Sequence, residues 1–301
     1  MIGLGPMHGL NYDPKLSSAV PFTPATGQRF LFQQGQASEI LQHQLLTAAR
    51  ELCIERDLSS WHGLFLNRDE IENTSKSSDY LVRHSNQFHW QNQDYGDFEQ
   101  FLGTLTSKKR KNIKRERRRI ADMNVQYRWI TGAELTPEVM ATMYKFYQRT
   151  IGLYGAQAYL NVAFFKYLAD HFSDNTLVLF AYFDDQIIAG GLYFKGDDVL
   201  YGRYWGALDN FHSVHFETCY YQAIQWCIEQ GYARFEAGAQ GEHKLARGLS
   251  PATTYSAHWF KDPRFHDAIE QFIEQEQSQV ARYQNSVTQH SPYRDKFLTE
   301  L

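Results

Sequence analysis

The sequence lacks the features of several simple protein classes. No run approaches the roughly eighteen consecutive apolar residues of a membrane-spanning helix, and the start lacks the basic and apolar stretches of a signal peptide. It has only three cysteines, Cys53, Cys219 and Cys227, and no CxxC pair. Neither a disulfide framework nor a cysteine zinc site is therefore expected. These absences predict a soluble cytoplasmic protein whose cysteines are reduced and packed.

Apolar residues are abundant enough for a sizeable core. Of the 301 residues, 43% are hydrophobic and 15% are aromatic. This length and composition suit either two domains or one large domain.

Positive charge is concentrated in one segment, 108–119. This segment holds nine of the 30 Lys and Arg residues and one acid, Glu116, so the rest of the chain has 21 basic and 33 acidic residues. Like charges three and four positions apart destabilise a helix unless something negative lies against them. The segment therefore predicts an anionic partner or substrate, with a solvated helix face as the alternative.

Apolar periodicity and turn residues predict the order of the secondary structure. Before residue 123 we expect short strands at 19–20 and 30–32, helices at 38–56 and from Asp97, a strand at 61–66, and a basic helix with Ile113 and Ile120 turned inward. After it we expect helices at 137–147 and 162–172, antiparallel strands at 177–182, 186–194 and 199–205, a helix at 214–230, a strand at 233–237 and an amphipathic helix from Asp262. The packed face of this amphipathic helix is expected to include Phe272 and Ile273. The last strand should lie in the same sheet as the other three.

Residues 235–249 combine three glycines with five ionisable side chains, directly after a strand-like run. Glycines let backbone N–H groups approach a ligand closely. Glu242 or His243 could accept a proton while Lys244, expected to be exposed, faces a developing oxyanion. Glu236 is a further candidate at the strand end. The alternative is an ordinary strand-to-helix turn with structural salt bridges.

A zinc site is not expected. His212, His215 and Glu217 have suggestive spacing, but a zinc site needs a further well-placed ligand. His89-Trp90 and His258-Trp259 are interpreted as packing pairs.

The order of elements and several local motifs resemble a known family. Two helices, three strands, a helix and a strand follow the order of the GNAT acyltransferase fold, in which a splayed sheet holds the acyl donor. The motifs VPFTPATG at 20–27, RKNIKRERR at 110–118, GAQGEHKLARG at 238–248 and TYSAHW at 254–259 resemble the FemAB-like proteins of this superfamily, which are described as peptidoglycan biosynthesis or recognition proteins.

The resemblance implies an α/β, GNAT-like fold with tandem halves, of which the amino-terminal half is incomplete. The expected division is a partial half at 1–105, a basic linker helix at 106–122, and a complete half at 123–301 with the carboxy-terminal amphipathic helix. Because Fem-type proteins carry a longer first half, the chain is expected to be shortened there.

The implied activity is transfer of an acyl or aminoacyl group to an amine, with a cell-wall precursor as candidate acceptor. Lys244 matches the lysine that lies near the substrate cleft in Fem-type enzymes, and the cleft is expected beside the gap between the halves. The expected catalytic residues are Glu242, His243 and Lys244. The expected substrate-binding residues are Glu236, Gln240, Arg247, Lys111, Lys114 and Arg118.

No metal and no permanently bound cofactor are expected. The sequence does not identify the acyl donor. Aminoacyl-tRNA and acyl-CoA are the two candidates, although residues 206–214 lack the clustered glycines that hold the pyrophosphate of acetyl-CoA. The alternative function is non-catalytic binding of an anionic ligand, either a nucleic acid or a cell-wall precursor, through the basic segment.

Overall fold

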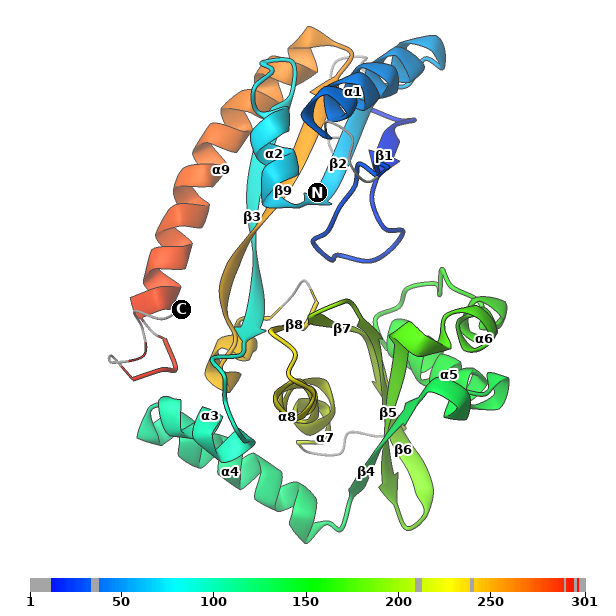
Figure 1. Ribbon diagram of the computed structural model, residues 1–301, viewed down its shortest axis with the longest axis vertical. Coiled ribbons are helices and arrows are strands. Elements are labelled where there is room, and N and C mark those ends of the chain that lie inside the picture. Colours follow the sequence, from blue (N-terminus) through cyan, green and yellow to red (C-terminus); the bar gives the residue numbers. More distant parts are fainter. Residues whose placement is uncertain are drawn as a thin grey trace. The chain divides into compact units, whose positions relative to one another are not determined.

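The computed structural model describes residues 12–33, 38–208, 213–238, 241–289, 291–294 and 297. The chain forms two compact units (Figure 1). Unit 1 comprises Met1–Gln87 and Ala252–Gln289, and unit 2 comprises Phe88–Pro251 and His290–Leu301. The chain thus passes between the units three times, whereas the sequence suggested a division on either side of the basic helix. The amphipathic helix at the carboxy-terminal end belongs to unit 1.

Unit 1 contains a mixed set of strands with three helices. Its strands, in order of pairing, are β1 (Leu16–Ser18), β2 (Ser60–Leu66), β9 (Ser250–Phe260) and β3 (Leu81–Gln91). Its helices are α1 (Ser38–Glu55), α2 (Arg68–Thr74) and α9 (Pro263–Gln289). Trp61 and Leu66 of β2 pack in the core with Cys53 of α1 and Ala257 of β9. The expected helices at 38–56 and from Asp262 and the strand at 61–66 are confirmed.

Two expectations for unit 1 are wrong. Residues 19–20 and 30–32 form no strand, and Phe30 instead reaches the core from an irregular segment, where it is 6% exposed. On α9, Phe272 was expected on the packed face but is 52% exposed, while Ile273 is buried. An amphipathic stripe defines a helix face only to within about one residue, because neighbouring positions lie roughly 100° apart.

Unit 2 contains a larger sheet. In order of pairing, its strands are the end of β3, then β8 (Arg234–Glu236), β7 (Val199–Ala207), β6 (Gln186–Lys195), β5 (Thr176–Phe183) and β4 (Gln126–Thr131). Strands β4 to β7 are antiparallel neighbours, and β8 lies parallel to β7. This confirms the expected three adjacent strands and places strand 233–237 in the same sheet.

The turn between β5 and β6 shows why this part was predictable. Asp184 and Asp185 have φ values of 47° and 60°, as a two-residue hairpin turn of the type I′ class requires. Aspartate tolerates this conformation better than most residues.

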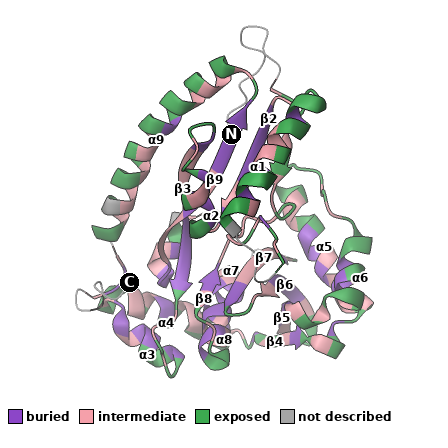
Figure 2. Cartoon of the chain, turned by 45° about the horizontal axis from the view of Figure 1, so that its top comes forward, coloured by how far each residue is buried: buried purple, intermediate pink, exposed green. Residues whose placement is uncertain are grey.

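Helices cover both faces of the sheet of unit 2. They are α3 (Phe98–Thr104), α4 (Ser107–Asp122), α5 (Pro137–Leu153), α6 (Val162–His171), α7 (Val214–Phe216) and α8 (Gln222–Gln230), with the π-helical segment η3 (Glu217–Tyr221) joining the last two. Because neighbouring strand residues point to opposite faces, Phe180 packs with Phe146 of α5 and Ala181 packs with Val214 of α7. Strands β5 and β6 are largely buried, while α9 of unit 1 is mostly exposed (Figure 2).

The expected basic helix is α4, and its inward residues Ile113 and Ile120 are 1% and 4% exposed. It does not continue from the preceding helix, because the backbone of Leu105 is extended and separates α3 from α4. The helix expected at 214–230 is present and ends at Gly231 with φ of 71°, but its π-helical turn was not expected. Within the described ranges, no helix is long and apolar enough to cross a membrane.

Candidate active site

The candidate site lies in unit 2, where two parallel strands stop pairing. Strands β7 and β8 pair from Val199 to Tyr201, opposite Arg234 to Glu236, after which β8 ends and β7 continues to Ala207. A Cβ built on Gly238 would lie 3.8 Å from the carbonyl oxygen of Gly202, so the chain after β8 stays against β7. The carboxyl ends of parallel strands are where α/β proteins commonly bind ligands.

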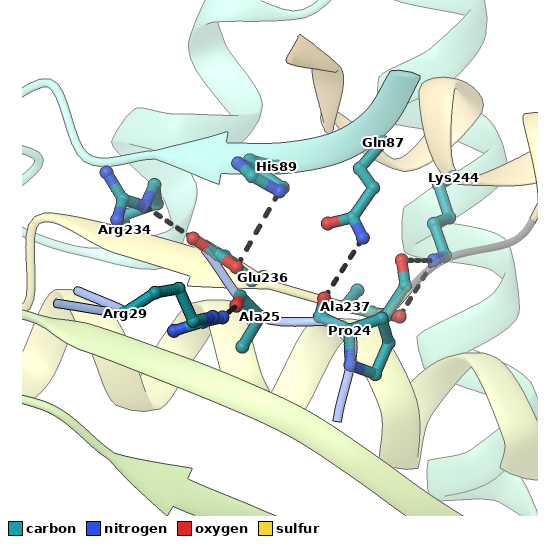
Figure 3. A network of polar contacts seen from close by, with 10 residues as sticks. Pro24, Ala25, Arg29, Gln87, His89, Arg234, Glu236, Ala237 and Lys244 are labelled. Atoms are coloured by element: carbon teal, nitrogen blue, oxygen red, sulfur yellow. Dashed lines mark hydrogen bonds and ion pairs between the residues drawn. The ribbon is translucent and has the colours of Figure 1, made fainter. Parts of the chain in front are cut away.

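Lys244 binds the backbone at this point. It lies in the 3₁₀ turn η4 (Glu242–Arg247), and its Nζ donates to the carbonyl oxygens of Ala237 at 2.7 Å and Gly238 at 2.6 Å (Figure 3). An ammonium group has three N–H donors, and these two hydrogen bonds use two of them. Lys244 is only 2% exposed, and this burial lowers its pKa to about 8.

The expectation that Lys244 is exposed is therefore wrong. The turn η4 folds back toward the end of β8, because Gly241 with φ of 112° and Gly248 with φ of 89° let the chain reverse on either side of it. The charged residues of the turn identified candidate site residues in the sequence. The burial of Lys244 could not be predicted in this way, because it depends on the chain reversal at Gly241 and Gly248.

Among the described ionisable side chains of the turn, His243 is exposed while Lys244 and Arg247 are buried. Its Nε2 lies 2.8 Å from the hydroxyl oxygen of Tyr220 in η3. Partial burial, and then the positive charges of Arg247 and Lys244, lower the pKa of His243. The imidazole is consequently neutral near pH 7 and can accept a proton. A Cβ on Gly241 would lie 2.3 Å from His243 Cε1, so this glycine leaves room for the ring.

Arg247 fixes the turn to its surroundings. Its Nη1 donates to the carbonyl oxygen of His243 at 2.7 Å, and its Nη2 lies 3.3 and 3.4 Å from the two carboxylate oxygens of Glu116. The guanidinium also lies 3.5 Å above the centroid of the Phe216 ring. Arg247 was expected to bind substrate, and the contacts described for it are with these protein groups.

Aromatic rings surround His243. The ring of His215 lies 4.7 Å from that of Trp205 on β7 and 6.2 Å from that of His243, and burial lowers the pKa of His215 to about 4. Phe216 and Tyr220 complete the cluster. Sequence reasoning missed Tyr220 and Trp205, because the π-helical turn that directs Tyr220 toward His243 has no sequence signal.

Glu236 lies among protein groups. It is 2% exposed, and its Oε1 accepts from Arg234 Nε at 3.1 Å, while its Oε2 lies 3.8 Å from His89 Nε2 (Figure 3). Burial lowers the pKa of His89 to about 3, so this imidazole is neutral. The carboxylate of Glu236, which was expected to bind substrate, thus lies against Arg234 at the end of β8.

The other residues predicted for the site either lie outside the described residues or lie on helix α4. Gln240 lies outside the described residues, as does the side chain of Glu242. Lys111 and Arg118 are exposed on α4, and Lys114 pairs with Glu99 at 2.6 Å.

The basic side chains of α4 border a hollow in unit 2. Lys114, Arg117 and Arg118 line it together with Phe98 of α3 and Glu217 of η3, and its volume is about 600 Å³. Helix α4 contacts η4 through Glu116, the acid of the basic segment, which binds Arg247.

A metal centre is not formed by the described side chains, since no three of their His, Cys, Asp and Glu residues cluster together. His212 lies outside those residues.

The comparisons with known proteins agree with this architecture. A family model named FemAB-like and described as peptidoglycan biosynthesis/recognition matches residues 5–295. Among curated proteins, none matches the chain.

Solved structures with a similar fold include L-PGS from Bacillus licheniformis and FemX. The L-PGS structure is 12% identical with a TM-score of 0.57, and the match covers 78% of each chain. FemX is 11% identical with a TM-score of 0.51, and the match covers 84% of this chain and 85% of FemX. At such identities the likeness concerns the fold, and together with the element order it confirms the GNAT-like α/β fold.

Proposed function

Because the chain belongs to the FemAB-like family, we propose that it is an aminoacyl- or acyltransferase that acylates an amine of a peptidoglycan precursor. The observation that carries this proposal is that an exposed His243 with a lowered pKa is followed directly by a buried Lys244, in the turn after the point where β7 and β8 part. A base beside a fixed cation is what acyl transfer to an amine requires.

The proposed reaction gives His243 and Lys244 separate roles. The amine nitrogen attacks the ester or thioester carbonyl of the donor, and the carbonyl oxygen gains negative charge as the new C–N bond forms. His243 takes the proton that the amine loses and returns it to the departing oxygen or sulfur when the donor's bond breaks. The third N–H of Lys244 stabilises the oxyanion, since its other two are held by Ala237 and Gly238.

Tyr220, Arg247 and Glu116 are proposed as positioning residues. Tyr220 bonds the imidazole of His243, and Arg247 bonds its backbone carbonyl oxygen. Glu116 in turn holds Arg247. Fixing both the ring and the backbone of His243 reduces the reorganisation needed to reach the transition state.

We propose aminoacyl-tRNA as the donor, used without a resident cofactor. The exposed Lys111 and Arg118 on α4 suit a polyanion, and the segment after β7 lacks clustered glycines for a CoA pyrophosphate. Such a donor would place the reaction in the cytoplasm, where charged tRNA is available.

The second candidate is a protein that binds an anionic ligand without chemistry. The observation that favours it is the exposed cationic face of α4 itself. Under this alternative the contacts within η4 serve only to hold the turn.

The test is incubation of the protein with mixed charged tRNA or acyl-CoA and a precursor peptide that bears a free amine, followed by mass spectrometry of the peptide. We expect the peptide to gain the mass of one aminoacyl residue from charged tRNA. His243→Gln serves as the chemical control. A peptide of unchanged mass with every donor, while tRNA still binds, would support the binding alternative.

A further inference from the structure

An extra residue in β7 places an arginine beside the point where the strands part. In the pairing of β6 with β7, Leu192 lies opposite Tyr204 and Tyr193 lies opposite Gly202, so Arg203 has no opposing residue. Such a bulge changes the face to which side chains point, and bulges are frequent next to active sites.

The bulge brings Arg203 and Tyr204 to the same side of the sheet. Tyr204 packs against Tyr147 of α5, with ring centroids 4.7 Å apart. The guanidinium carbon of Arg203 lies 4.2 Å from the Tyr204 ring centroid, and its Nη2 lies 3.5 Å from the Tyr159 hydroxyl oxygen. Regular alternation would have placed Arg203 and Tyr204 on opposite faces.

The guanidinium of Arg203 has no anionic partner among the residues that the structure describes. Its Nε is buried and has no hydrogen-bond acceptor among those residues. The 3.5 Å distance from its Nη2 to the Tyr159 hydroxyl oxygen is at the limit of hydrogen bonding. By contrast, Arg117 and Arg247 each bond a carboxylate of unit 2. A planar guanidinium can donate two parallel hydrogen bonds to the oxygens of a carboxylate or phosphate. Arg203 is therefore suited to bind an oxyanion.

Arg203 lies next in the chain to a residue that contacts the segment holding Lys244. Its neighbour Gly202 lies against Gly238, whose carbonyl oxygen holds Lys244. On the other side of β7, Trp205 contacts His215 of the cluster around His243. The strand therefore presents Arg203 toward α5 and α6 while the proposed base and oxyanion groups lie toward α7.

We propose that Arg203, with the hydroxyl of Tyr159 and the ring of Tyr204, is an anion subsite that selects acceptor amines carrying a carboxylate or phosphate. This rests on the proposed function for its link to turnover, but the subsite can be tested by binding alone. The anion would anchor the acceptor on the α5 side of β7, with its amine directed toward the turn η4.

The experiment measures binding by calorimetry of two matched pairs of amines: lysyl-alanine against its carboxyl-terminal amide, and phosphoethanolamine against ethanolamine. We expect the wild-type protein to prefer the anionic member of at least one pair by on the order of tenfold or more, as charged hydrogen bonds allow. The pair that shows the preference identifies carboxylate or phosphate as the recognised group.

The variant Arg203→Gln should remove this preference. Arg203→Lys should retain only part of it, because lysine keeps the positive charge but cannot donate the paired hydrogen bonds of a guanidinium. Arg128→Gln is the matched control, since Arg128 is an exposed arginine of β4 that pairs with Glu134. Equal binding within both pairs, no binding of any of the four amines, or an unchanged preference in folded Arg203→Gln and Arg203→Lys would overturn the proposal.

Turnover separates this proposal from the proposed function. If transfer occurs, Arg203→Gln should raise KM for the anionic acceptor at nearly constant kcat, with little effect on the neutral acceptor. If no acceptor is acylated but the binding preference disappears in Arg203→Gln, the transferase proposal fails while the anion subsite stands.

Discussion

Arg247 Nη2 lies 3.3 Å from Glu116 Oε1, which joins the candidate catalytic turn to the basic helix α4. Both side chains are largely buried, at 9% and 17% exposure, and the Tyr221 hydroxyl also donates to Glu116. The one acid of the basic segment is therefore a structural partner of η4. This relationship makes the turn dependent on a helix more than a hundred positions earlier.

Breaking this pair should destabilise the protein and slow transfer. Glu116→Gln leaves Arg247 without its counter-charge, and we expect a double-mutant cycle with Arg247→Met to give a coupling of about 1–3 kcal/mol. The measurement is chemical denaturation of the wild type, both single variants and the double variant. Additive losses would show that the contact contributes nothing.

Transfer should fall as the pH rises through about 8, because Lys244 then loses the proton that it needs to face the oxyanion. The measurement is kcat between pH 6.5 and 10. In Lys244→Arg, any remaining activity should keep its rate above pH 8, since arginine stays charged. The same alkaline decline in both proteins would assign it to another group.

Lys244→Met should also destabilise the fold, since the carbonyl oxygens of Ala237 and Gly238 lose their donor. We expect a loss of about 1–3 kcal/mol, measured by denaturation. An unchanged free energy of unfolding would contradict the buried position of Lys244.

The exposed cations of α4 should dominate the salt dependence of tRNA binding. Replacing Lys111 and Arg118 with alanine should reduce the slope of log K against log salt by roughly 1.4–1.8, from about 0.7–0.9 for each phosphate contact. Lys114→Ala is the control and should have a smaller effect, because Lys114 pairs with Glu99. An unchanged slope in the double variant would show that this face does not contact the tRNA.

Unit 1 should lose stability in mild acid because of a buried histidine pair. His62 Nδ1 lies 2.7 Å from His258 Nδ1, so one ring donates and the other accepts. Burial lowers the pKa of His62 to about 4 and that of His258 to about 3. Below about pH 6.5 the unfolded chain binds protons that the folded chain does not, so this contribution to stability is present above that pH and is lost toward pH 4.

The measurement for this pair is the free energy of unfolding at several pH values between 7 and 4. The wild type should lose more stability over this range than a variant in which His62 and His258 are both asparagine. Parallel pH curves would contradict the assignment, since other buried histidines such as His89 and His215 remain in both proteins.

Local chemistry explains which parts of the fold could be predicted. Asp184 and Asp185 form the hairpin turn and Gly231 ends the helix through their own backbone preferences. Strand β3 (Leu81–Gln91) was missed because its middle residues are polar and only partly buried. Its partner β8 is more than 140 positions away, so no local pattern marks it.

The candidate site was predicted less completely than the fold. The glycines and charges around Lys244 identified the turn, but its burial depends on carbonyl oxygens at the end of β8. Tyr220 and Arg203 reach their positions through a π-helical turn and a β-bulge. Both features insert a residue against the regular period, so periodicity in the sequence cannot reveal them.

The most direct test of the account is single-turnover transfer by His243→Gln, from charged tRNA to an amine-bearing precursor peptide. His243 is exposed and its side chain bonds Tyr220, so glutamine should preserve the fold while removing the base. We predict a rate lower by about 10²–10⁴, with a melting temperature close to that of the wild type. A wild-type rate in folded His243→Gln would contradict the central claim that this turn supplies the base for acyl transfer.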